Sequence, residues 1–190
     1  IAELMGMLNP SYGIMTAVGE QHLESFGSLS AVENTKFEMC EHMCKGGCVV
    51  FDCASENTES LANRYRGEKK LVNIEGGFAY LTNLKMSSKG CKFKLHIAKK
   101  SVDIETKIIG RLLLNDLVAA AAMAYLLGVE IELIADTIAQ IKPFPHRLQI
   151  IETPYTTIID DSYNSNLVGA GQALEALKLF KGKKIVITPG

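Results

Sequence analysis

The sequence lacks the features that mark several classes of protein. It has no Trp, and its 20 Lys and Arg are balanced by 21 Asp and Glu, which leaves a formal net charge of -1. A general nucleic-acid-binding protein needs a dense basic surface, so this balance argues against that class. No apolar run is long enough for a membrane-spanning helix, and the first residues lack the basic start and apolar centre of a signal peptide. We expect a globular protein that binds neither nucleic acid nor a membrane.

Cysteine occurs in an odd number, five, and without a secretory context. Reduced thiols in the cytoplasm are therefore the default expectation. Cys40, Cys44 and Cys48, with His42 between them, match neither the paired Cys-x-x-Cys of zinc sites nor the usual iron–sulfur spacings. Small buried thiols on one helix face explain Cys40 and Cys44 equally well. We predict no metal site in this segment and a cytoplasmic location.

Complete nucleotide-binding motifs are also missing. The sequence contains no Gly-x-x-x-x-Gly-Lys-Ser/Thr phosphate loop, and the Gly-Ala-Gly of residues 169–171 lies inside a helical pattern rather than at a strand-to-helix turn. Nothing in these 190 residues can hold the β- and γ-phosphates of a nucleotide, so we expect the isolated chain to be inactive. The abrupt apolar end at residues 185–188 leads us to expect a piece of a longer protein.

The apolar pattern of the first part predicts an α/β arrangement. Residues 12–18 are apolar and partly β-branched, which suits a buried parallel strand. Ser30 and Glu33 predict a capping box for the next helix, which we expect to end after Lys45. Residues 49–51 are typical of a second buried strand, so this part of the chain is predicted to form a βαβ unit.

The middle of the chain changes character. From Lys69 to about Ile109, apolar and polar residues alternate with period two, which predicts an antiparallel meander with one wet face. An Ala-rich helix is predicted from Asn115 to Leu127, and a second, amphipathic helix spans about residues 131–141. On the final strand of the meander, the side chains expected on one face are those of Val102, Ile104, Thr106 and Ile108.

A domain boundary is predicted close to residue 146. The Lys-Pro-Phe-Pro of residues 142–145 breaks the helical pattern. Beyond it we expect a strand at residues 156–159, a polar loop at 160–166, a helix, and a final strand at 185–188. Strands and helices thus alternate again after the break, which favours a second α/β unit.

Polar residues follow the predicted strands. Ligands of open α/β sheets gather at the carboxyl ends of strands, where His22 lies, with Lys36 in the following helix. Asp161 and Asn164, in the loop of residues 160–166, could hydrogen-bond a ribose or simply close an Asx turn. Taken singly, each of these residues is better explained by a surface, capping or turn role.

Several short segments occur together in one order along nearly the whole chain. Together they resemble the Mur ligases, the ATP-dependent amide-forming enzymes of peptidoglycan precursor synthesis, and most closely the branch that adds D-alanyl-D-alanine. Any one segment is weak, but in register they are specific. The segments are 16–28 (TAVGEQHLESFGS), 36–38 (KFE), Asn115 with its Ala-rich helix, 145–149 (PHRLQ), 160–166 (DDSYNSN) and 188–190 (TPG).

The resemblance implies a fold and a reaction. Residues 1–146 would belong to a central ATPase domain, a parallel sheet with flanking helices plus the small antiparallel meander, and residues 147–190 would begin a Rossmann-like C-terminal domain. The family's phosphate loop and an acidic magnesium ligand would lie upstream of Ile1. ATP, with Mg²⁺, would activate the carboxylate of a nucleotide-sugar peptide, UDP-MurNAc-tripeptide, as an acyl phosphate that the amine of D-Ala-D-Ala attacks.

The resemblance also implies roles for individual residues. His22 and Lys36 would be the catalytic, metal-side residues, with His22 a magnesium ligand and Lys36 carbamylated by carbon dioxide. Carbamylation requires the neutral amine and therefore a lowered lysine pKa. The nucleotide-binding residues would be Asn115 near the adenine, Arg147 at the phosphates, and Asp161 and Asn164 at the ribose.

Two departures from the family pattern keep other interpretations open. Ala17 stands where the family often has Asn, and residues 110–115 are more apolar than the usual Gly-x-His-Asn stretch. A non-catalytic relative that kept the fold and lost the nucleotide site is the second hypothesis. A third is a folate- or cyanophycin-type ligase or another Mur member, which His146, Arg147 and residues 160–166 disfavour.

Overall fold

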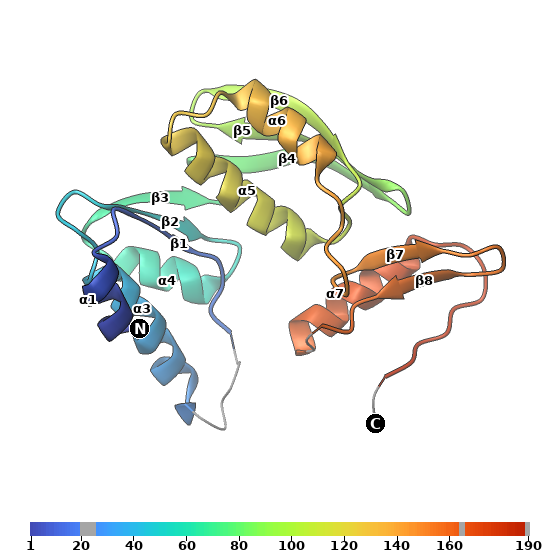
Figure 1. The fold of residues 1–190 in the computed structure, drawn as a ribbon, viewed down its shortest axis with the longest axis horizontal. Coiled ribbons are helices and arrows are strands. Elements are labelled where there is room, and N and C mark those ends of the chain that lie inside the picture. Colours follow the sequence, from blue (N-terminus) through green and yellow to red (C-terminus); the bar gives the residue numbers. More distant parts are fainter. Residues whose placement is uncertain (20–25, 164–165, 189–190) are drawn as a thin grey trace.

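The computed structural model describes residues 1–19, 26–163 and 166–188. They form a six-stranded sheet with helices packed on it and a separate two-stranded sheet (Figure 1). The strands of the large sheet follow chain order. They are β1 (Tyr12–Met15), β2 (Cys48–Asp52), β3 (Glu68–Val72), β4 (Ala79–Ser87), β5 (Gly90–Ile97) and β6 (Lys100–Thr106).

The first three strands run parallel to one another. Helix α3 (Leu29–Glu41) lies between β1 and β2 in the chain, and α4 (Glu56–Arg64) lies between β2 and β3. All five residues of β2 are buried, as expected for a strand covered on both faces. A short helix, α1 (Ala2–Leu8), precedes β1 and packs beside α3. The predicted βαβ unit is confirmed, although β1 is shorter than the predicted strand.

The start and end of α3 differ from the prediction. The side chain of Ser28, not that of Ser30, caps the helix, and its Oγ accepts a hydrogen bond from the Ala31 N–H at 3.2 Å. Ser28 has the extended backbone that an N-cap requires, whereas Ser30 already lies inside the helix. The helix ends at Glu41, before the predicted end at Lys45. The capping box prediction is therefore wrong by two residues.

The prediction that an antiparallel meander begins at residue 69 is wrong for its first strand. β3 pairs with β2 in parallel along its whole length, because the crossover helix α4 returns the chain to the same direction. β3 meets β4 at a single parallel pair, Val72 with Ala79. Strands β4, β5 and β6 then form the predicted antiparallel meander. On β6, Ile104 is buried between exposed Asp103 and Glu105, which confirms the predicted alternation.

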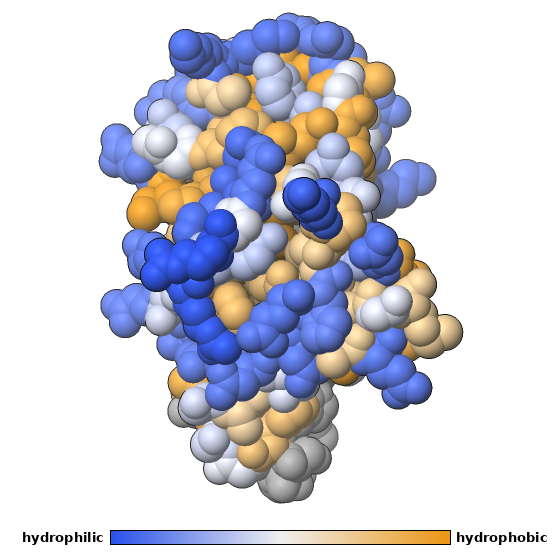
Figure 2. All heavy atoms as spheres, turned by 90° about the vertical axis from the view of Figure 1, so that its left-hand side faces the viewer, coloured by the Kyte–Doolittle hydropathy of each residue, from blue (hydrophilic) through white to orange (hydrophobic). Residues whose placement is uncertain are grey.

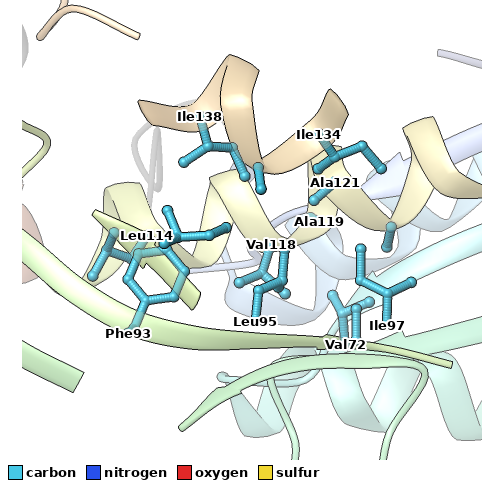
Figure 3. Close-up of a cluster of buried hydrophobic side chains, with 14 of the residues drawn as sticks. Val72, Phe93, Leu95, Ile97, Leu114, Val118, Ala119, Ala121, Ile134 and Ile138 are labelled. Carbon is cyan, nitrogen blue, oxygen red and sulfur yellow. The ribbon is translucent and has the colours of Figure 1, made fainter. Parts of the chain in front are cut away.

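The largest core lies between the sheet and two helices, α5 (Arg111–Leu126) and α6 (Ile131–Gln140). Figure 3 shows α5 between the strands and α6, with Leu95 and Ile97 on the strand side and Ile134 and Ile138 on the α6 side. Val118 of α5 is 1% exposed at the centre. The Ala-rich sequence of α5 lets the neighbouring layers approach closely, because each Ala presents only a methyl group.

Helix α5 begins four residues before its predicted start. Arg111 is its first residue, so Asn115 lies in its second turn and Leu114 is fully buried. Gly110 precedes the helix at φ 97°, a left-handed conformation that favours glycine. The apolar run of residues 112–114, which lies before the predicted start of the helix, is thus part of the helix that joins the core.

The chain after residue 146 forms a separate small unit. β7 (Gln149–Glu152) and β8 (Thr157–Asp160) make an antiparallel hairpin, followed by α7 (Leu167–Lys178). This unit meets α5 through a small cluster of buried side chains, Ile109, Leu148 and Ala176. β7 was not predicted, and residues 181–188 form no strand within the described part of the chain. Because Ile187 is 91% exposed, the predicted final strand is wrong for this structure.

Both apolar and charged groups reach the surface. Figure 2 shows the side of the molecule that carries α1, where hydrophilic residues dominate and hydrophobic patches lie between them. Leu4, Met7 and Leu8 of α1 are exposed. Within residues 1–19, 26–163 and 166–188, no helix combines the length and the apolar character needed to cross a membrane.

Candidate functional site

Polar residues gather where the parallel strands end. The carboxyl ends of β1, β2 and β3 point to the same edge of the sheet, toward the first turns of α5 (Figure 1). Asp52 is the last residue of β2, Asn73 follows β3, and Asn115 belongs to α5. In open α/β sheets this edge is where ligands bind.

A hydrogen-bond network fixes these three residues. Asp52 is 4% exposed, and its Oδ1 accepts hydrogen bonds from the Ala54 N–H at 3.0 Å and from Asn73 Nδ2 at 2.9 Å. The same Nδ2 donates to the main-chain oxygen of Asn115 at 3.0 Å. Asn73 has φ 60°, which Asn adopts more readily than most residues. The network therefore ties the ends of two strands to α5.

Burial controls the charge of Asp52. Loss of water raises the pKa of its carboxyl group, while the hydrogen bonds from Ala54 and Asn73 and the charge of Arg111 oppose that rise. Arg111 is itself held at the start of α5, because its main-chain N–H donates to Gln172 Oε1 of α7 at 2.9 Å. The arginine thus adjoins both the strand-end network and the C-terminal unit.

Asp116 brings the two parts of the chain into electrostatic contact. It lies on the surface of α5, but the surrounding chain removes enough water to raise its pKa, and the Asp52 carboxylate raises it further. The charge of Arg147, from beyond residue 146, acts in the opposite direction. A negative side chain of α5 and a positive side chain of the C-terminal unit therefore share one region.

Lys36 is anchored next to the end of β1. It lies in the middle of α3, partly buried, and its Nζ donates to the main-chain oxygen of Ala17 at 2.8 Å. Burial lowers the pKa of this amine. Asn57 of α4 donates to the main-chain oxygen of Val18 at 3.1 Å, so two helices hold the segment that follows β1. His22, the other predicted metal-side residue, lies outside the described residues.

The C-terminal unit has its own polar cluster. His146 Nδ1 lies 2.8 Å from Asp160 Oδ2, and hydrogen bonds from Ser162 and His146 lower the pKa of Asp160. Asp161 Oδ1 accepts a hydrogen bond from the Leu148 N–H at 3.1 Å. At least one oxygen of Asp161 therefore holds the chain that leads into β7.

Arg147 stacks on an aromatic ring. Its guanidinium group lies 4.5 Å from the centroid of the Tyr163 ring, and the Tyr163 N–H donates to the main-chain oxygen of His146 at 3.1 Å. An exposed cation–π pair of this kind contributes about 0.5–1 kcal/mol. The stack orients the cation whose charge lowers the pKa of Asp116. Asn164, which the resemblance also implies in binding, lies outside the described residues.

The buried state of Asn115 bears on its predicted contact with adenine. Its side chain is 5% exposed, and its Oδ1 is buried without a hydrogen-bond partner among the described residues. Asp116, the next residue, is the one that α5 turns toward water. The contact of Asn115 with adenine stays a prediction, and Asp116 joins it as a candidate.

Sequence reasoning missed four residues of this region: Asp52, Asn73, Arg111 and Asp116. The sequence does contain a signal for Asp52. This residue is the polar end of the apolar run of residues 48–52, just as His22 is a polar residue after the first predicted strand. Asn73 gave no such signal, because its place at the carboxyl edge depends on β3 running parallel to β2.

The cysteines lie away from this chemistry. All five are free, and burial raises the pKa of Cys40, Cys53 and Cys91 to about 11. Within the described ranges, no group of three His, Cys, Asp or Glu side chains is arranged to hold a metal ion. Thiols with such pKa values are almost wholly protonated near neutral pH, which is typical of structural cysteines.

With the fold and this geometry in place, comparison with known proteins decides the family. The model of the Mur ligase middle domain matches residues 2–124. The chain belongs to the Mur ligase family. Among curated Mur ligases, the UDP-N-acetylmuramoyl-tripeptide--D-alanyl-D-alanine ligase of Escherichia coli is 26% identical over 191 residues, which cover 98% of this chain and 42% of that protein.

Solved Mur ligase structures have the same fold. A crystal structure of MurF from Acinetobacter baumannii superposes on this chain with a TM-score of 0.88 at 23% identity. The match covers 95% of this chain and 40% of the MurF chain. The structure of MurF ligase from Thermotoga maritima, in complex with ADP, gives a TM-score of 0.85 at 23% identity. That match covers 96% of this chain and 42% of the Thermotoga chain. The chain therefore spans about two fifths of the length of these relatives.

Proposed function

We propose that this chain is part of an ATP-dependent carboxylate–amine ligase of peptidoglycan precursor synthesis, which adds D-Ala-D-Ala to UDP-MurNAc-tripeptide. The observation that carries this proposal is the match to the Mur ligase middle domain, together with a relative of that activity that aligns over 98% of the chain. The partly buried Lys36 beside the end of β1 supports it. A cytoplasmic location accords with five free cysteines.

The division of the chain is part of the proposal. Residues 1–146 would belong to the central ATPase domain and residues 147–190 would begin the C-terminal domain. In support, the six-stranded and two-stranded sheets are separate, and the small cluster around Leu148 joins the second unit to α5. Asp116 of α5 and Arg147, from the two sides of this division, influence each other electrostatically.

The residues present fit ATP and Mg²⁺ chemically. When bound, these groups would activate the substrate carboxylate as an acyl phosphate and neutralise the charge of the transferred phosphoryl group. His22 supplies an imidazole, and a carbamylated Lys36 would supply an anionic oxygen for the metal side. Arg147 offers a cation for phosphates. The nucleoside side would involve Asp161 and Asn164 at the ribose and Asn115 near the adenine.

Lys36 can acquire its carbamate by simple chemistry. The ammonium group first loses one proton; the neutral amine then forms an N–C bond to carbon dioxide and releases a second proton, so a cation becomes an anion. Partial burial disfavours the charged amine, lowers its pKa and so raises the neutral fraction at a given pH. The main-chain oxygen of Ala17 holds Nζ toward the end of β1, where the carbamate would be used.

The first test is ligation by the full-length protein. With ATP, Mg²⁺ and UDP-MurNAc-tripeptide, phosphate release should require D-Ala-D-Ala. Lys36→Ala should lower the rate by about 10²-fold or more, because it removes a positioned charge. Lys45→Ala, an exposed lysine just beyond α3, is the matched control and should keep the wild-type rate. A folded Lys36→Ala protein with full activity would contradict the assignment.

The carbamate itself can be observed. After addition of ¹³C-bicarbonate, NMR should show a carbamate signal that Lys36→Ala removes and Lys45→Ala keeps. Because the pKa of Lys36 is lowered, its neutral fraction rises at a lower pH than that of an exposed lysine, and the signal should appear correspondingly earlier as pH increases. A signal with the pH dependence of an ordinary lysine would argue against an activated Lys36.

The same assays separate the alternatives. A full-length protein that binds no ATP would favour the hypothesis of a non-catalytic relative. The apolar start of α5 supports that hypothesis. Leu113, however, packs in the cluster that joins α5 to the C-terminal unit, so part of this apolar run has a structural role. Ligation of a different amine, with D-Ala-D-Ala inactive, would favour another Mur or folate-type ligase.

A further inference from the structure

The three residues that follow the break at 142–145 have an unusual backbone. His146 has φ 62° and Leu148 has φ 48°, so two residues in the left-handed region flank Arg147. Histidine enters this region more often than most residues, but a bulky leucine there is a clear outlier. Such a backbone persists only where the surrounding contacts over-determine it, and it is concentrated at functional sites. We call residues 146–148 the Arg147 turn.

Each main-chain N–H of the Arg147 turn has a hydrogen-bond partner. The first two N–H groups bond locally, to Gln149 Oε1 at 3.3 Å and to the main-chain oxygen of Phe144 at 3.2 Å. The third, that of Leu148, donates to Asp161 Oδ1 at 3.1 Å. Asp161 lies 13 residues further along the chain. Its carboxylate therefore ties the turn to the loop that follows β8.

The side chain of Leu148 fastens the same turn to the first part of the chain. It is 5% exposed and packs with Ile109 and Ala176 in the small cluster beside α5. Gly110 leaves room for it, since an added Cβ there would lie 2.5 Å from Leu148 Cδ1. Burial of the leucine side chain and the hydrogen bond from its N–H to Asp161 thus both stabilise the left-handed conformation.

The loop after β8 also orients the side chain of Arg147. The Tyr163 N–H donates to the main-chain oxygen of His146, and the Tyr163 ring lies under the guanidinium group, 4.5 Å from centroid to carbon. The charge of Arg147 acts on Asp116 of α5. Arg147 is exposed, so a ligand can reach this cation. Because an arginine side chain has many rotamers, a fixed turn and a ring beneath it reduce the ordering that binding would require.

We propose that the Arg147 turn is a rigid support that presents the guanidinium group to an anionic ligand, and that Asp161 is the positioning residue that holds it. Asp161 acts here through the N–H of Leu148 and not by touching the ligand. This role uses Oδ1 and is additional to the ribose contact that the family resemblance implies for Asp161. The inference deepens the proposed function and rests on it where it identifies the anion as the phosphates of ATP.

The first test observes Arg147 directly, by NMR of the full-length protein with ¹⁵N-labelled arginine. The Nε–H signal of Arg147, identified by its loss in Arg147→Gln, should lie upfield, because the guanidinium group is over the Tyr163 ring. Asp161→Ala should move this signal most of the way to the position of an exposed arginine, as Tyr163→Leu should. Asp161→Asn keeps an oxygen that can accept the Leu148 N–H and should keep the shift.

The molecule contains an internal control for this measurement. Arg64 lies over the Phe37 ring, 4.0 Å from its centroid, and its signal should be unchanged in every variant that folds. Asp136→Ala, at an exposed position of α6, is the matched control and should move neither signal. An unchanged Arg147 signal in Asp161→Ala would overturn the proposal. Equal losses in Asp161→Ala and Asp161→Asn would also overturn it, because the hydrogen bond would then not be the cause.

Ligand binding tests whether Asp161 acts through Arg147. The measured quantity is the preference of the full-length protein for ATP over adenosine, in which a ribose contact cancels because both ligands carry the ribose. Arg147→Gln should lower this preference about tenfold or more, since it removes a charge-assisted contact to phosphate. Asp161→Ala should lower it less, and should lower it no further in the Arg147→Gln background. Additive losses, or an unchanged preference in Asp161→Ala, would overturn the proposal.

These readouts separate the inference from the proposed function. The Arg147 signal depends on side chains of the protein alone, so it decides the inference even in a protein that performs no ligation. The expected signals and preferences without ligase activity would overturn the proposed function and leave the inference standing. Ligation with wild-type kcat and wild-type KM for ATP in a folded Asp161→Ala protein would overturn the inference and leave the function standing.

Discussion

The two sides of residue 146 use apolar residues in different ways. In the part before residue 146, Leu95 of β5 and Val118 of α5 are 0% and 1% exposed, in a core enclosed by a sheet and two helices. In the part after residue 146, Tyr155 of the hairpin and Leu167 of α7 are 98% and 89% exposed. The apolar content of a segment therefore predicts burial only where another layer is present to cover it. The C-terminal unit is held mainly through one small cluster.

The largest expected effect comes from the core of the first part. Leu95→Ala should lower the free energy of unfolding by about 2–5 kcal/mol, because it leaves a cavity between the sheet and α5. The same substitution at Leu174 of α7, which is 48% exposed, should cost less than about 1 kcal/mol. Urea denaturation of both variants measures the contrast. Equal losses would mean that the C-terminal unit is as well packed as the core.

An intermediate effect is expected at the junction of the two parts. Gly110→Ala should cost about 1–3 kcal/mol, since the residue has φ 97° and an added Cβ would lie 2.5 Å from Leu148 Cδ1. Hydrogen exchange should become faster in α7 and stay unchanged in β2.

The matched control for this junction is Gly171→Ala in α7. An added Cβ there meets no atom within 4 Å, so the variant should be neutral or slightly stabilising through helix propensity. A Gly110→Ala protein with wild-type exchange in α7 would show that Leu148 does not fasten the C-terminal unit.

The smallest effect concerns the His146–Asp160 pair. The pKa of Asp160 is lowered from 3.8, first by Ser162 and then by His146. Its contribution to stability is therefore present above the ordinary pKa and disappears as pH falls through the lower, folded-state pKa. Asp160→Asn should lower Tm slightly at neutral pH and not at strongly acid pH. Asp136→Asn, at an exposed position of α6, should show no such pH dependence. A Tm loss for Asp160→Asn that is equal at both pH values would exclude the hydrogen bonds to the Asp160 carboxylate as its cause.

Local periodicity was sufficient for much of the fold. The βαβ unit, α6, and the alternation around Ile104 were predictable because each depends on side chains a few residues apart. The boundaries of α3 and α5 were less accurate. Ser28 and Ser30 are both good capping residues, and only the backbone conformation selects Ser28. Of the candidate site residues, Lys36 was predicted through the resemblance and its role stays a prediction, whereas Asp52 and Arg111 were not predicted.

The sequence by itself determined the α/β class, the family resemblance and most helices, because these follow from spacing along the chain. The tertiary structure decided what spacing cannot express. Asn73 follows Asp52 by 21 residues, and Asn115 follows Asn73 by 42. The three residues meet because three parallel strands end at one edge beside α5. Hydrogen bonds between such distant segments form only when the strands are paired in the sheet.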